Sequence, residues 1–477
     1  MTNKYITTTI PYVNADPHIG FALEIVQADT WARAQNLIGN SVVFNTGTDE
    51  HGAKIYEKAQ IENKDTQDYV NEYAQKFKHL KVLLNLSFTN FIRTTNPDHK
   101  KAAQEFWNRC WQNGDIYLDT YKVKYCVGCE LAKTESELTD GKCPLHSNRE
   151  LELIEEENYF FRFSKYQEKL LELYSKQPDF VKPDHRLEEI KNFVSNGLED
   201  FSISRIKKKM PWGIAVPGDD HHVMYVWFDA LVNYISTLGW PTDMTSFSKS
   251  WPGVQVAGKD NLRQQSAMWQ AMLMSAGLPS SKQIFIHGFI SMNGQKISKS
   301  TGNIVDPVEL VNIYGVDATR YYLLREIPAL DDGDFSFSRM DQIFQSDLAN
   351  ELGNLVSRVT TLAEKDGVEM SEQSLEKTSI LSEHLEMIES FEFAKVLESI
   401  WQNFKLMNKE INEVEPWKLQ LDQRTPYLIK WLSLLSNQGY ALKPFLPETA
   451  EKIINATTGK IEKIAPLFPK KNLNHNS

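Results

Sequence analysis

The stretch ITTTIPYVNADPHIGFALE, residues 6–24, decides the fold. Its β-branched beginning, residues 6–10, predicts a buried strand, and Pro11 ends that strand because proline has no N–H for a sheet ladder. A turn follows at 14–17, and a helical pattern starts after Gly20. A strand, a tight turn and a helix N-terminus together form a phosphate site, since free backbone N–H groups and the positive end of the helix dipole face the ligand.

His18 and Gly20 lie in that turn. An imidazole there can donate a hydrogen bond to a phosphate, and a glycine lets the ligand approach the backbone. The same histidine could simply cap the helix, and a lone His-x-Gly motif has that structural role more often. The phosphate interpretation therefore needs a second motif to support it.

With 41% hydrophobic and 24% charged side chains, the composition is that of an ordinary soluble globular protein. The length of 477 residues predicts about three domains. The N-terminus lacks the apolar core of a signal peptide, and no apolar run approaches about 18 residues, so we expect a cytoplasmic protein without membrane contact. The net charge of −11 argues against non-specific nucleic-acid binding. It leaves room for a structured RNA on residues 404–477, which carry 11 Lys and Arg against 7 Asp and Glu.

Two further segments point to the carboxyl edge of a parallel sheet. Residues 40–45 predict a second strand, which leads into a polar loop at 46–52. In that loop Asp49 could accept from an ammonium group or simply stabilise the turn. The near-continuous apolar run 223–230 predicts a parallel strand that is buried on both faces. Trp227 and Ala230 of this run, and Tyr234 just after it, could line a pocket for an apolar side chain or could simply be core residues.

A cysteine-rich segment predicts a metal site. Its two knuckles, C-x2-C and C-x2-H, are separated by thirteen residues and supply four ligands suited to tetrahedral zinc. The polar sequence between them could not bury a core unaided, so the metal would supply folding energy. Because no coordination position remains for water, we expect a structural zinc. The predicted ligands are Cys126, Cys129, Cys143 and His146.

A third predicted strand also ends in residues that could bind a nucleotide. The strand predicted at 254–257 opens into Gly258 and Asp260. A glycine followed by an acid at the end of a strand suits the hydroxyl pair of a ribose, as in other nucleotide-binding folds.

The segment SMNGQKISKS, residues 291–300, carries Lys296 and Lys299 beyond a turn. Mobile lysines can stabilise the charge that develops on a leaving polyphosphate. A Lys-Ser loop alone is usually solvated surface. Combined with His18 and Gly20 in a parallel α/β chain, it favours a triphosphate site.

The chain divides into four parts on this basis. Strand patterns give way to long helical patterns beyond Pro307, and the prolines between them favour an antiparallel bundle. The predicted fold is α/β: a Rossmann-like parallel-sheet catalytic domain with a zinc-binding connective insertion, followed by an α-helical bundle. The predicted boundaries are 1–115 and 221–325 for the two halves of the catalytic domain, 116–220 for the insertion, and 326–477 for a linker and the helical domain.

These motifs resemble those of class I aminoacyl-tRNA synthetases, in particular their methionine-specific branch. Residues 18–21, HIGF, are similar to the HIGH signature, and residues 296–300, KISKS, to the KMSKS signature. The resemblance covers nearly the whole chain. It implies an enzyme that uses ATP with Mg²⁺ to form methionyl-adenylate, releasing pyrophosphate. The enzyme would then ligate methionine to a tRNA(Met) with the anticodon CAU, initiator or elongator, releasing AMP.

The resemblance also implies roles for residues of this sequence. Asp49 would accept from the ammonium of methionine, while Tyr12 and Trp227 would enclose its thioether, a favourable sulfur–aromatic contact. The catalytic residues would be His18, Lys296 and Lys299, which would bind ATP together with Gly20, Gly258 and Asp260. The methionine pocket would comprise Ile10, Tyr12, Asp49, Trp227, Ala230, Tyr234 and Gln265. The anticodon would be read by Asn354, Arg358 and Trp417, with the tryptophan stacking on a base.

The sequence departs from the family pattern in several places. Phe21 stands where histidine or asparagine is usual, Gln265 where a histidine commonly lines the methionine pocket, and Asn261 where an apolar residue is usual. No extra RNA-binding dimerisation domain follows the bundle, so a monomer is expected. Because of these departures, a non-catalytic tRNA-binding paralogue also fits the sequence.

Two further enzyme classes fit the sequence less well. A class I synthetase for another amino acid, of the branched-chain kind, would need a large editing domain, and the roughly 275 residues between Gly20 and Lys296 leave too little room for it. A small nucleotidyltransferase with a similar phosphate signature would leave the helical C-terminal third unexplained.

Overall fold

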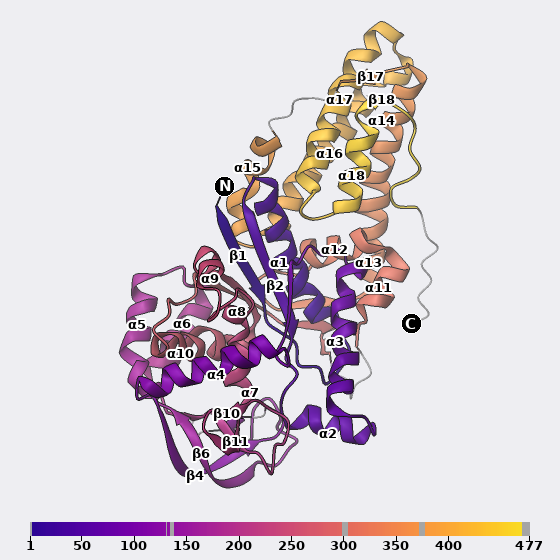
Figure 1. The fold of residues 1–477 in the computed structure, drawn as a ribbon. Helices are drawn as coiled ribbons and strands as arrows, with labels where there is room; N and C mark the ends of the chain where they lie inside the picture. Colours follow the sequence, from indigo (N-terminus) through magenta and orange to yellow (C-terminus); the bar gives the residue numbers. More distant parts are fainter. Residues whose placement is uncertain (1, 130, 134–137, 298–303, 372–376, 470–477) are drawn as a thin grey trace.

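The computed structural model describes the chain except for residues 1, 130, 134–137, 298–303, 372–376 and 470–477. Figure 1 shows three regions: a sheet flanked by helices, an antiparallel insertion at one end around β4 and β6, and a long helical bundle that projects from the other end. The α/β class, the insertion and the helical C-terminal part are as predicted.

The central sheet is entirely parallel and has six strands in the order β3-β2-β1-β12-β13-β7. Because β2 and β12 lie on opposite sides of β1, the strand order reverses direction there, and the carboxyl ends of β1 and β12 flank a crevice suited to a ligand. The strands are β1 (Asn3–Thr8), β2 (Ser41–Thr48), β3 (Asn90–Arg93), β7 (Val181–Lys182), β12 (Val254–Gly258) and β13 (Gln283–His287).

The hydrophobic core lies on both faces of this sheet. Alternate residues of β13 show this: Phe285 joins one buried cluster, whereas Ile284 and Ile286 join the other. The cluster of Phe285 continues without a break into the C-terminal helices, which therefore share a core with the sheet. The helices that cover the sheet include α1 (Ile19–Leu37), α3 (Thr66–Leu83), α4 (Pro97–Gln112) and α10 (Trp269–Ser275).

The interpretation of residues 223–230 as a parallel strand is wrong. They contain the end of β11 (Asp219–Met224), which pairs antiparallel with β9 (Ser204–Ile206) and β10 (Ala215–Val216), followed by the helix α7 (Val226–Leu231). A short apolar run fits a buried strand or a buried helix equally well, so its length and polarity could not separate the two.

The insertion is built on a long antiparallel pair. The strand β4 (Ile116–Cys126) pairs with β6 (Glu152–Phe161) from Ile116 opposite Phe161 to Tyr125 opposite Glu152. The far end of β4 carries the first predicted zinc ligand, Cys126. The ribbon thus places the first of these ligands at the end of a long antiparallel pair.

The lysine-bearing loop begins on a hairpin. The strand β14 (Ile290–Met292) turns at Asn293 and Gly294, both with positive φ, into β15 (Gln295–Lys296). The turn is as predicted. The strand β13 ends at His287, two residues before β14 begins, and between them Gly288 lies so near the Asp331 backbone that an added Cβ would be 2.2 Å from it. Lys299 lies outside the described residues.

The C-terminal helices form the predicted antiparallel bundle. Phe391 adopts a left-handed backbone with φ 61° and lies between two of these helices, α15 and α16. None of the helices in the described part of the chain is both long and apolar enough to cross a membrane. The helices are α11 (Pro307–Tyr314), α12 (Val316–Arg325), α13 (Phe337–Ile343), α14 (Asn354–Lys365), α15 (Lys377–Glu389), α16 (Phe393–Val414), α17 (Leu421–Leu442) and α18 (Pro447–Ala456), with a π-helical segment η5 (Phe344–Gly353) between α13 and α14.

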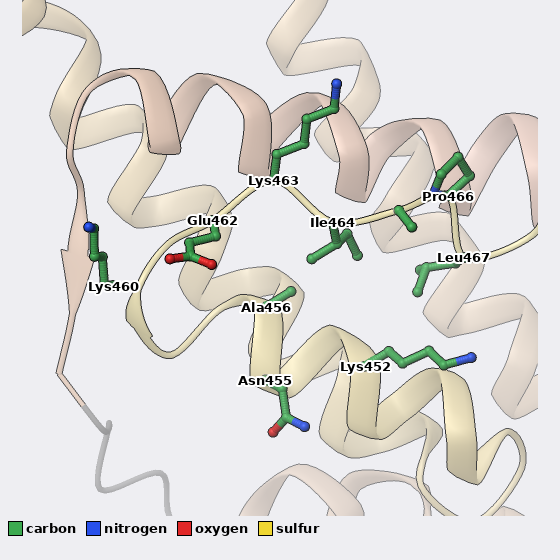
Figure 2. Close-up of a pocket in the computed structure, with 10 residues that line it drawn as sticks. Lys452, Asn455, Ala456, Lys460, Glu462, Lys463, Ile464, Pro466 and Leu467 are labelled. Carbon is green, nitrogen blue, oxygen red and sulfur yellow. The ribbon is translucent and has the colours of Figure 1, made fainter.

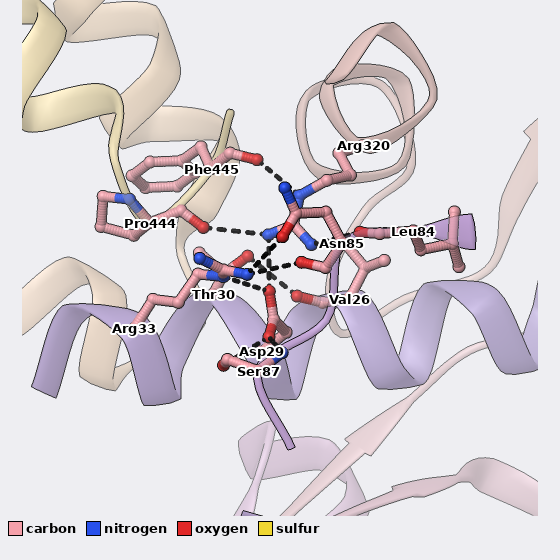
Figure 3. Close-up of polar contacts among 10 residues, drawn as sticks. All are labelled: Val26, Asp29, Thr30, Arg33, Leu84, Asn85, Ser87, Arg320, Pro444 and Phe445. Carbon is pink, nitrogen blue, oxygen red and sulfur yellow. Dashed lines mark hydrogen bonds and ion pairs between the residues drawn. The ribbon is translucent and has the colours of Figure 1, made fainter. Parts of the chain in front are cut away.

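A buried arginine joins the bundle to the sheet region (Figure 3). Arg320 on α12 is fully buried and lies 2.8 Å from a carboxylate oxygen of Asp29 on α1. Its other N–H groups donate to three backbone carbonyls, of Leu84, Pro444 and Phe445. The guanidinium therefore connects three segments that are far apart in the sequence.

Candidate active site

The N-terminus of α1 lies at the carboxyl edge of β1, as the phosphate-site interpretation requires. His18 is the N-cap, and its Nδ1 accepts from the backbone N–H of Gly20 at 3.1 Å. A side chain at Gly20 would come within 3.0 Å of the His18 ring. The histidine therefore does cap the helix. Because the cap uses Nδ1 as an acceptor, Nε2 carries the proton and can donate to an anionic ligand.

A cavity of about 290 Å³ opens between the segments that follow β1 and β2 and the helix α7. It brings together every residue predicted for the methionine pocket, and also Asp260 from the predicted ribose site. The lining residues that the sequence predicted are Ile10, Tyr12, Asp49, Trp227, Ala230, Tyr234, Asp260 and Gln265. The lining residues that the sequence did not assign to the cavity are Thr9, Pro11, Lys54, Cys129, Val226, Leu231, Asn233 and Asn261.

Backbone pairing holds the acidic group of this cavity in place. The N–H of Asp49 donates to the carbonyl of Pro11 at 2.9 Å, and the N–H of Val13 donates to the carbonyl of Asp49 at 3.1 Å. The loops after β1 and β2 are thus tied to each other. Asp49 is 8% exposed and lines the cavity, so a carboxylate faces the space where an ammonium group would fit.

Behind Asp49 lies a buried charge cluster that the sequence did not reveal. The carboxylate of Asp229 on α7 contacts Nδ1 of His51 at 2.7 Å and Nε2 of His99 at 3.0 Å, and all three side chains are almost fully buried. Although burial favours the neutral acid, the two imidazoles hold the pKa of Asp229 below its usual value. The cluster ties α7, which carries Trp227, to the loop that carries Asp49.

A second charged pair lies under the predicted nucleotide site. The ring of His287 contacts the Gly288 carbonyl through Nδ1 at 2.8 Å and the Glu24 carboxylate through Nε2 at 2.9 Å. Both partners are acceptors, so the ring donates from both nitrogens and is an imidazolium. Although burial lowers the pKa of His287, the hydrogen bond to Glu24 and its charge raise it above the ordinary value. The other carboxylate oxygen of Glu24 accepts from Thr9, a residue of the cavity.

The four predicted metal ligands converge. Their thiol and imidazole atoms all lie within 4.8 Å of one another, a set of three sulfurs and one nitrogen suited to tetrahedral zinc. A side chain at Gly128 would come within 2.4 Å of the His146 ring, so the knuckle requires glycine there. The ammonium of Lys54 donates to the Gly128 carbonyl at 2.9 Å. Since Lys54 and Cys129 also line the 290 Å³ cavity, the knuckle forms part of its wall.

Comparison with known proteins identifies this arrangement. A family model described as tRNA synthetases class I (M) matches residues 4–152 and 132–360. A methionine–tRNA ligase of Thermotoga maritima is 42% identical over 469 residues, which span 94% of this chain and 74% of that protein. One of Thermosynechococcus vestitus is also 42% identical, over 94% of this chain and 88% of that protein.

A solved structure agrees with the sequence comparisons. The structure of Mycobacterium tuberculosis methionyl-tRNA synthetase in complex with methionyl-adenylate superposes with a TM-score of 0.92 at 36% identity, covering 98% of this chain and all of that one. The chain belongs to the methionine–tRNA ligase family.

In this synthetase the predicted anticodon residues also converge. Asn354 and Arg358 on α14 and Trp417 beyond α16 line one hollow of about 680 Å³. Two asparagines of α16 hold the guanidinium of Arg358: Asn412 accepts at 2.9 Å and Asn408 at 2.5 Å. Asn408 and Asn412 line the same hollow, and no periodic signal in the sequence selects them from other polar residues of α16.

A further hollow of the synthetase, of about 480 Å³, lies between α18 and the segment that follows it (Figure 2). Lys463 lines both this hollow and the neighbouring one with Trp417. The hollow is lined by the basic residues Lys452 and Lys460 and by the acidic residue Glu462. It contains no residue predicted for catalysis, metal binding or anticodon recognition.

Proposed function

We propose that this chain ligates L-methionine to tRNA(Met), initiator and elongator, in two steps at the 290 Å³ cavity. A carboxylate oxygen of methionine attacks the α-phosphorus of ATP, and the bond to pyrophosphate breaks to give methionyl-adenylate. A terminal ribose hydroxyl of the tRNA then attacks the acyl carbon, and AMP leaves. The convergence of the predicted methionine residues and Asp260 on one cavity, in a member of the methionine–tRNA ligase family, carries this proposal.

In the methionine subsite Asp49 accepts from the ammonium group, and Tyr12 and Trp227 enclose the thioether. The support is that these side chains line the same small cavity, where a carboxylate and two aromatic rings face a common space. A sulfur against aromatic rings gains a modest contact beyond its burial. Ile10, Ala230, Tyr234 and Gln265 complete the subsite.

In the ATP subsite His18 and Gly20 bind the triphosphate, and Gly258 and Asp260 bind the ribose. The N-terminus of α1 supports the first role, because Nε2 of His18 is a donor and the helix end is positive. Mg²⁺ would enter with the triphosphate as part of the substrate. Lys296 and Lys299 would stabilise the charge on departing pyrophosphate, so that catalysis consists of positioning and electrostatic stabilisation.

Zn²⁺ would be held by Cys126, Cys129, Cys143 and His146 as one structural ion per chain. The donor set and its compactness support zinc, and four protein ligands leave no position for water. When bound, the ion would supply folding energy to the polar knuckle. The anticodon CAU would be read in the 680 Å³ hollow, where Asn354 and Arg358 bind base edges and Trp417 stacks on a base.

The four parts proposed are residues 1–115 and 221–325 for the two halves of the catalytic domain, 116–220 for the insertion, and 326–477 for the linker and anticodon-binding bundle. We place the enzyme in the cytoplasm, since its four cysteines are free thiols, three of them at the metal cluster, as suits a reducing compartment. A monomer suffices, because each hollow described above is built from one chain.

The decisive experiment is ATP–pyrophosphate exchange with zinc-loaded protein, run with each standard amino acid in turn. We expect exchange with methionine alone. Exchange with another amino acid would overturn the substrate, and no exchange with any amino acid would favour a non-catalytic tRNA-binding paralogue. Charging of a CAU-anticodon transcript, and failure to charge one with an altered anticodon, would test the second step.

A further inference from the structure

A lysine between the two predicted ribose residues joins the end of β12 to a distant part of the chain. Lys259 follows Gly258 and precedes Asp260. Its ammonium contacts both carboxylate oxygens of Asp332, at 2.7 Å each. The same ammonium lies 4.5 Å from the centroid of the Phe289 ring, a cation–π contact. Lys259 is thus held by two groups that follow it in the sequence by 30 residues or more.

Both partners of Lys259 belong to the base of the hairpin that leads into the lysine loop. The Oδ1 atom of Asp332 also accepts from the backbone N–H of Phe289 at 2.8 Å, and the Phe289 carbonyl accepts from the N–H of Gly333 at 2.9 Å. From there β14, the first strand of the hairpin, pairs in parallel with β16 (Gly333–Phe335). The carboxylate of Asp332 therefore binds Lys259 and the residue that precedes β14 at the same time.

A second carboxylate supports the turn of the same hairpin. The Oδ1 atom of Asp334 accepts from the Ser291 hydroxyl at 2.6 Å and from the backbone N–H of Gly294 at 2.8 Å. The N–H of Asn293 donates to the Phe335 carbonyl at 3.1 Å. This segment therefore supports the hairpin from its base to its turn, and a displacement of the segment displaces the hairpin.

The ion pair lies near the surface, so the stability of the fold depends little on it. The side chains of Lys259 and Asp332 are 23% and 61% exposed, and exposed pairs contribute little to folding. The hydrogen bonds from Lys259 and from the N–H of Phe289 hold the pKa of Asp332 below its usual value, so the carboxylate is charged. The pair fixes the spacing of two elements instead, namely the end of β12 and the base of the hairpin.

We propose that Lys259 is a positioning residue for ATP, which holds the end of β12 and the lysine-bearing hairpin at the spacing that one ATP molecule requires. In the ATP subsite proposed above, the ribose binds at Gly258 and Asp260, and the departing phosphates meet the lysines beyond the hairpin turn. Covalent bonds set the distance between ribose and phosphates, so the two protein elements must match it. This inference rests on the proposed function, because it takes ATP as the ligand of both elements.

The test compares ATP with adenosine, which has the ribose but none of the phosphates. ATP–pyrophosphate exchange at saturating methionine gives kcat/KM for ATP, and the same assay gives the inhibition constant of adenosine. Lys259→Met and Asp332→Asn each remove the ion pair, and asparagine keeps an oxygen for the N–H of Phe289. Each variant should lower kcat/KM for ATP about three- to tenfold, because a small misplacement of bound groups slows the reaction. The inhibition constant of adenosine, KM for methionine and the midpoint of urea unfolding should stay near native.

Two combinations of variants separate the ion pair from other roles of Lys259. The double variant should lose no more than the worse single variant, because both changes remove one interaction. Lys259→Arg keeps a cation that pairs well with a carboxylate and should retain a kcat/KM for ATP within about twofold of native. Losses that multiply in the double variant, or a loss in Lys259→Arg equal to that in Lys259→Met, would overturn the proposal.

Lys182→Met is the matched control. Lys182 on β7, at the edge of the same sheet, contacts the carboxylates of Asp179 and Asp184 at 2.8 Å each and is 28% exposed. Its kcat/KM for ATP should equal that of the native chain. A loss as large as that of Lys259→Met would attribute the effect to the removal of any paired surface lysine and would overturn the proposal.

Three further results would also overturn it. A loss in Lys259→Met with native values in Asp332→Asn would mean that the lysine acts on the nucleotide directly. A parallel rise in the inhibition constant of adenosine would place the disturbance in the ribose site itself, and native kcat/KM in both variants would remove the role altogether. Should Lys259→Met show no exchange, Asp332→Asn decides by the same two constants. Native protein that fails to exchange with methionine would refute the proposed function instead, which separates the two failures.

Discussion

The two hollows assigned to recognition are built in opposite ways. The cavity at the sheet edge has about 290 Å³, and its floor residues Tyr234 and Gln265 are at most 2% exposed. The hollow on the helical bundle has about 680 Å³, and its aromatic residue, Trp417, is 50% exposed. The first holds its polar groups inside fixed hydrogen-bond chains, whereas the second presents an aromatic face to solvent.

This difference matches the size of what each site would recognise. A small substrate can be enclosed by buried side chains. An RNA loop cannot be enclosed, and its unstacked bases are read by stacking and by hydrogen bonds to their edges. In the open hollow Arg358 is held from two sides, by Asn408 and Asn412. The two regions meet at the buried guanidinium of Arg320.

The largest effect is expected where the two regions join. Arg320→Met leaves Asp29 with one arginine fewer in a fully buried position, and breaking a buried ion pair costs about 3–5 kcal/mol. The pKa of Asp29 is held below its usual value against burial by Arg320 and Arg33, so the carboxylate is charged in the native chain. We expect the midpoint of urea unfolding to fall sharply.

The control for this change is Arg339→Met. Arg339 pairs with Glu326 at 2.6 Å, but its side chain is 51% exposed, and exposed pairs contribute about 0–1 kcal/mol. Its unfolding midpoint should stay near that of the native chain. Equal losses in both variants would mean that the buried guanidinium is not what joins the bundle to the sheet region.

The next effect concerns the catalytic side of the comparison. Lys299→Ala removes a charge that would stabilise departing pyrophosphate, and the loss of one such group lowers kcat by about 10²–10³. Methionine affinity should remain near native, because the substrate side chain is bound in the enclosed cavity. Single-turnover adenylation and equilibrium binding of methionine measure the two quantities separately. A native adenylation rate would exclude this role for Lys299.

On the RNA side, Trp417→Ala should raise KM for tRNA while leaving pyrophosphate exchange unchanged. Stacking of a base on an aromatic ring contributes about 1–3 kcal/mol, which corresponds to a loss of about five- to 150-fold in kcat/KM for aminoacylation. Trp111→Ala is a matched control, since Trp111 on α4 is 49% exposed and lies outside the 680 Å³ hollow. A loss in exchange as well would show that the change reaches the catalytic region.

The sequence predicted the parts of this structure that depend on local pattern. The convergence of the four candidate metal ligands, the turn at Asn293 and the strand-turn-helix unit around His18 each follow from residue types at short spacing, and the structure has all three arrangements. The placement of the methionine residues around one cavity followed from the family resemblance. That resemblance supplied the tertiary contacts that a single sequence does not contain.

The rest depends on contacts between distant segments. The apolar run 223–230 favours a strand, but the structure has the end of β11 and the helix α7 there, because a short apolar run fits a buried helix as well as a buried strand. The cluster around Asp229 joins residues 51, 99 and 229, and a chain of hydrogen bonds joins residues 234, 255, 265 and 281, so no local pattern marks either one. A buried glutamine looks the same in the sequence as a surface glutamine.

The smallest effect expected is a pH dependence at the nucleotide side of the active site. The pKa of His287 is raised by Glu24, so the imidazolium contributes stability that is fully present below the unfolded value of 6.5 and is lost as pH rises through the higher folded value. His287→Gln removes this term, because a glutamine does not titrate. The native chain should therefore exceed the variant in urea midpoint most at pH 6 and progressively less at higher pH. A difference that is constant from pH 6 to 9 would mean that the Glu24–His287 pair does not lose a proton there.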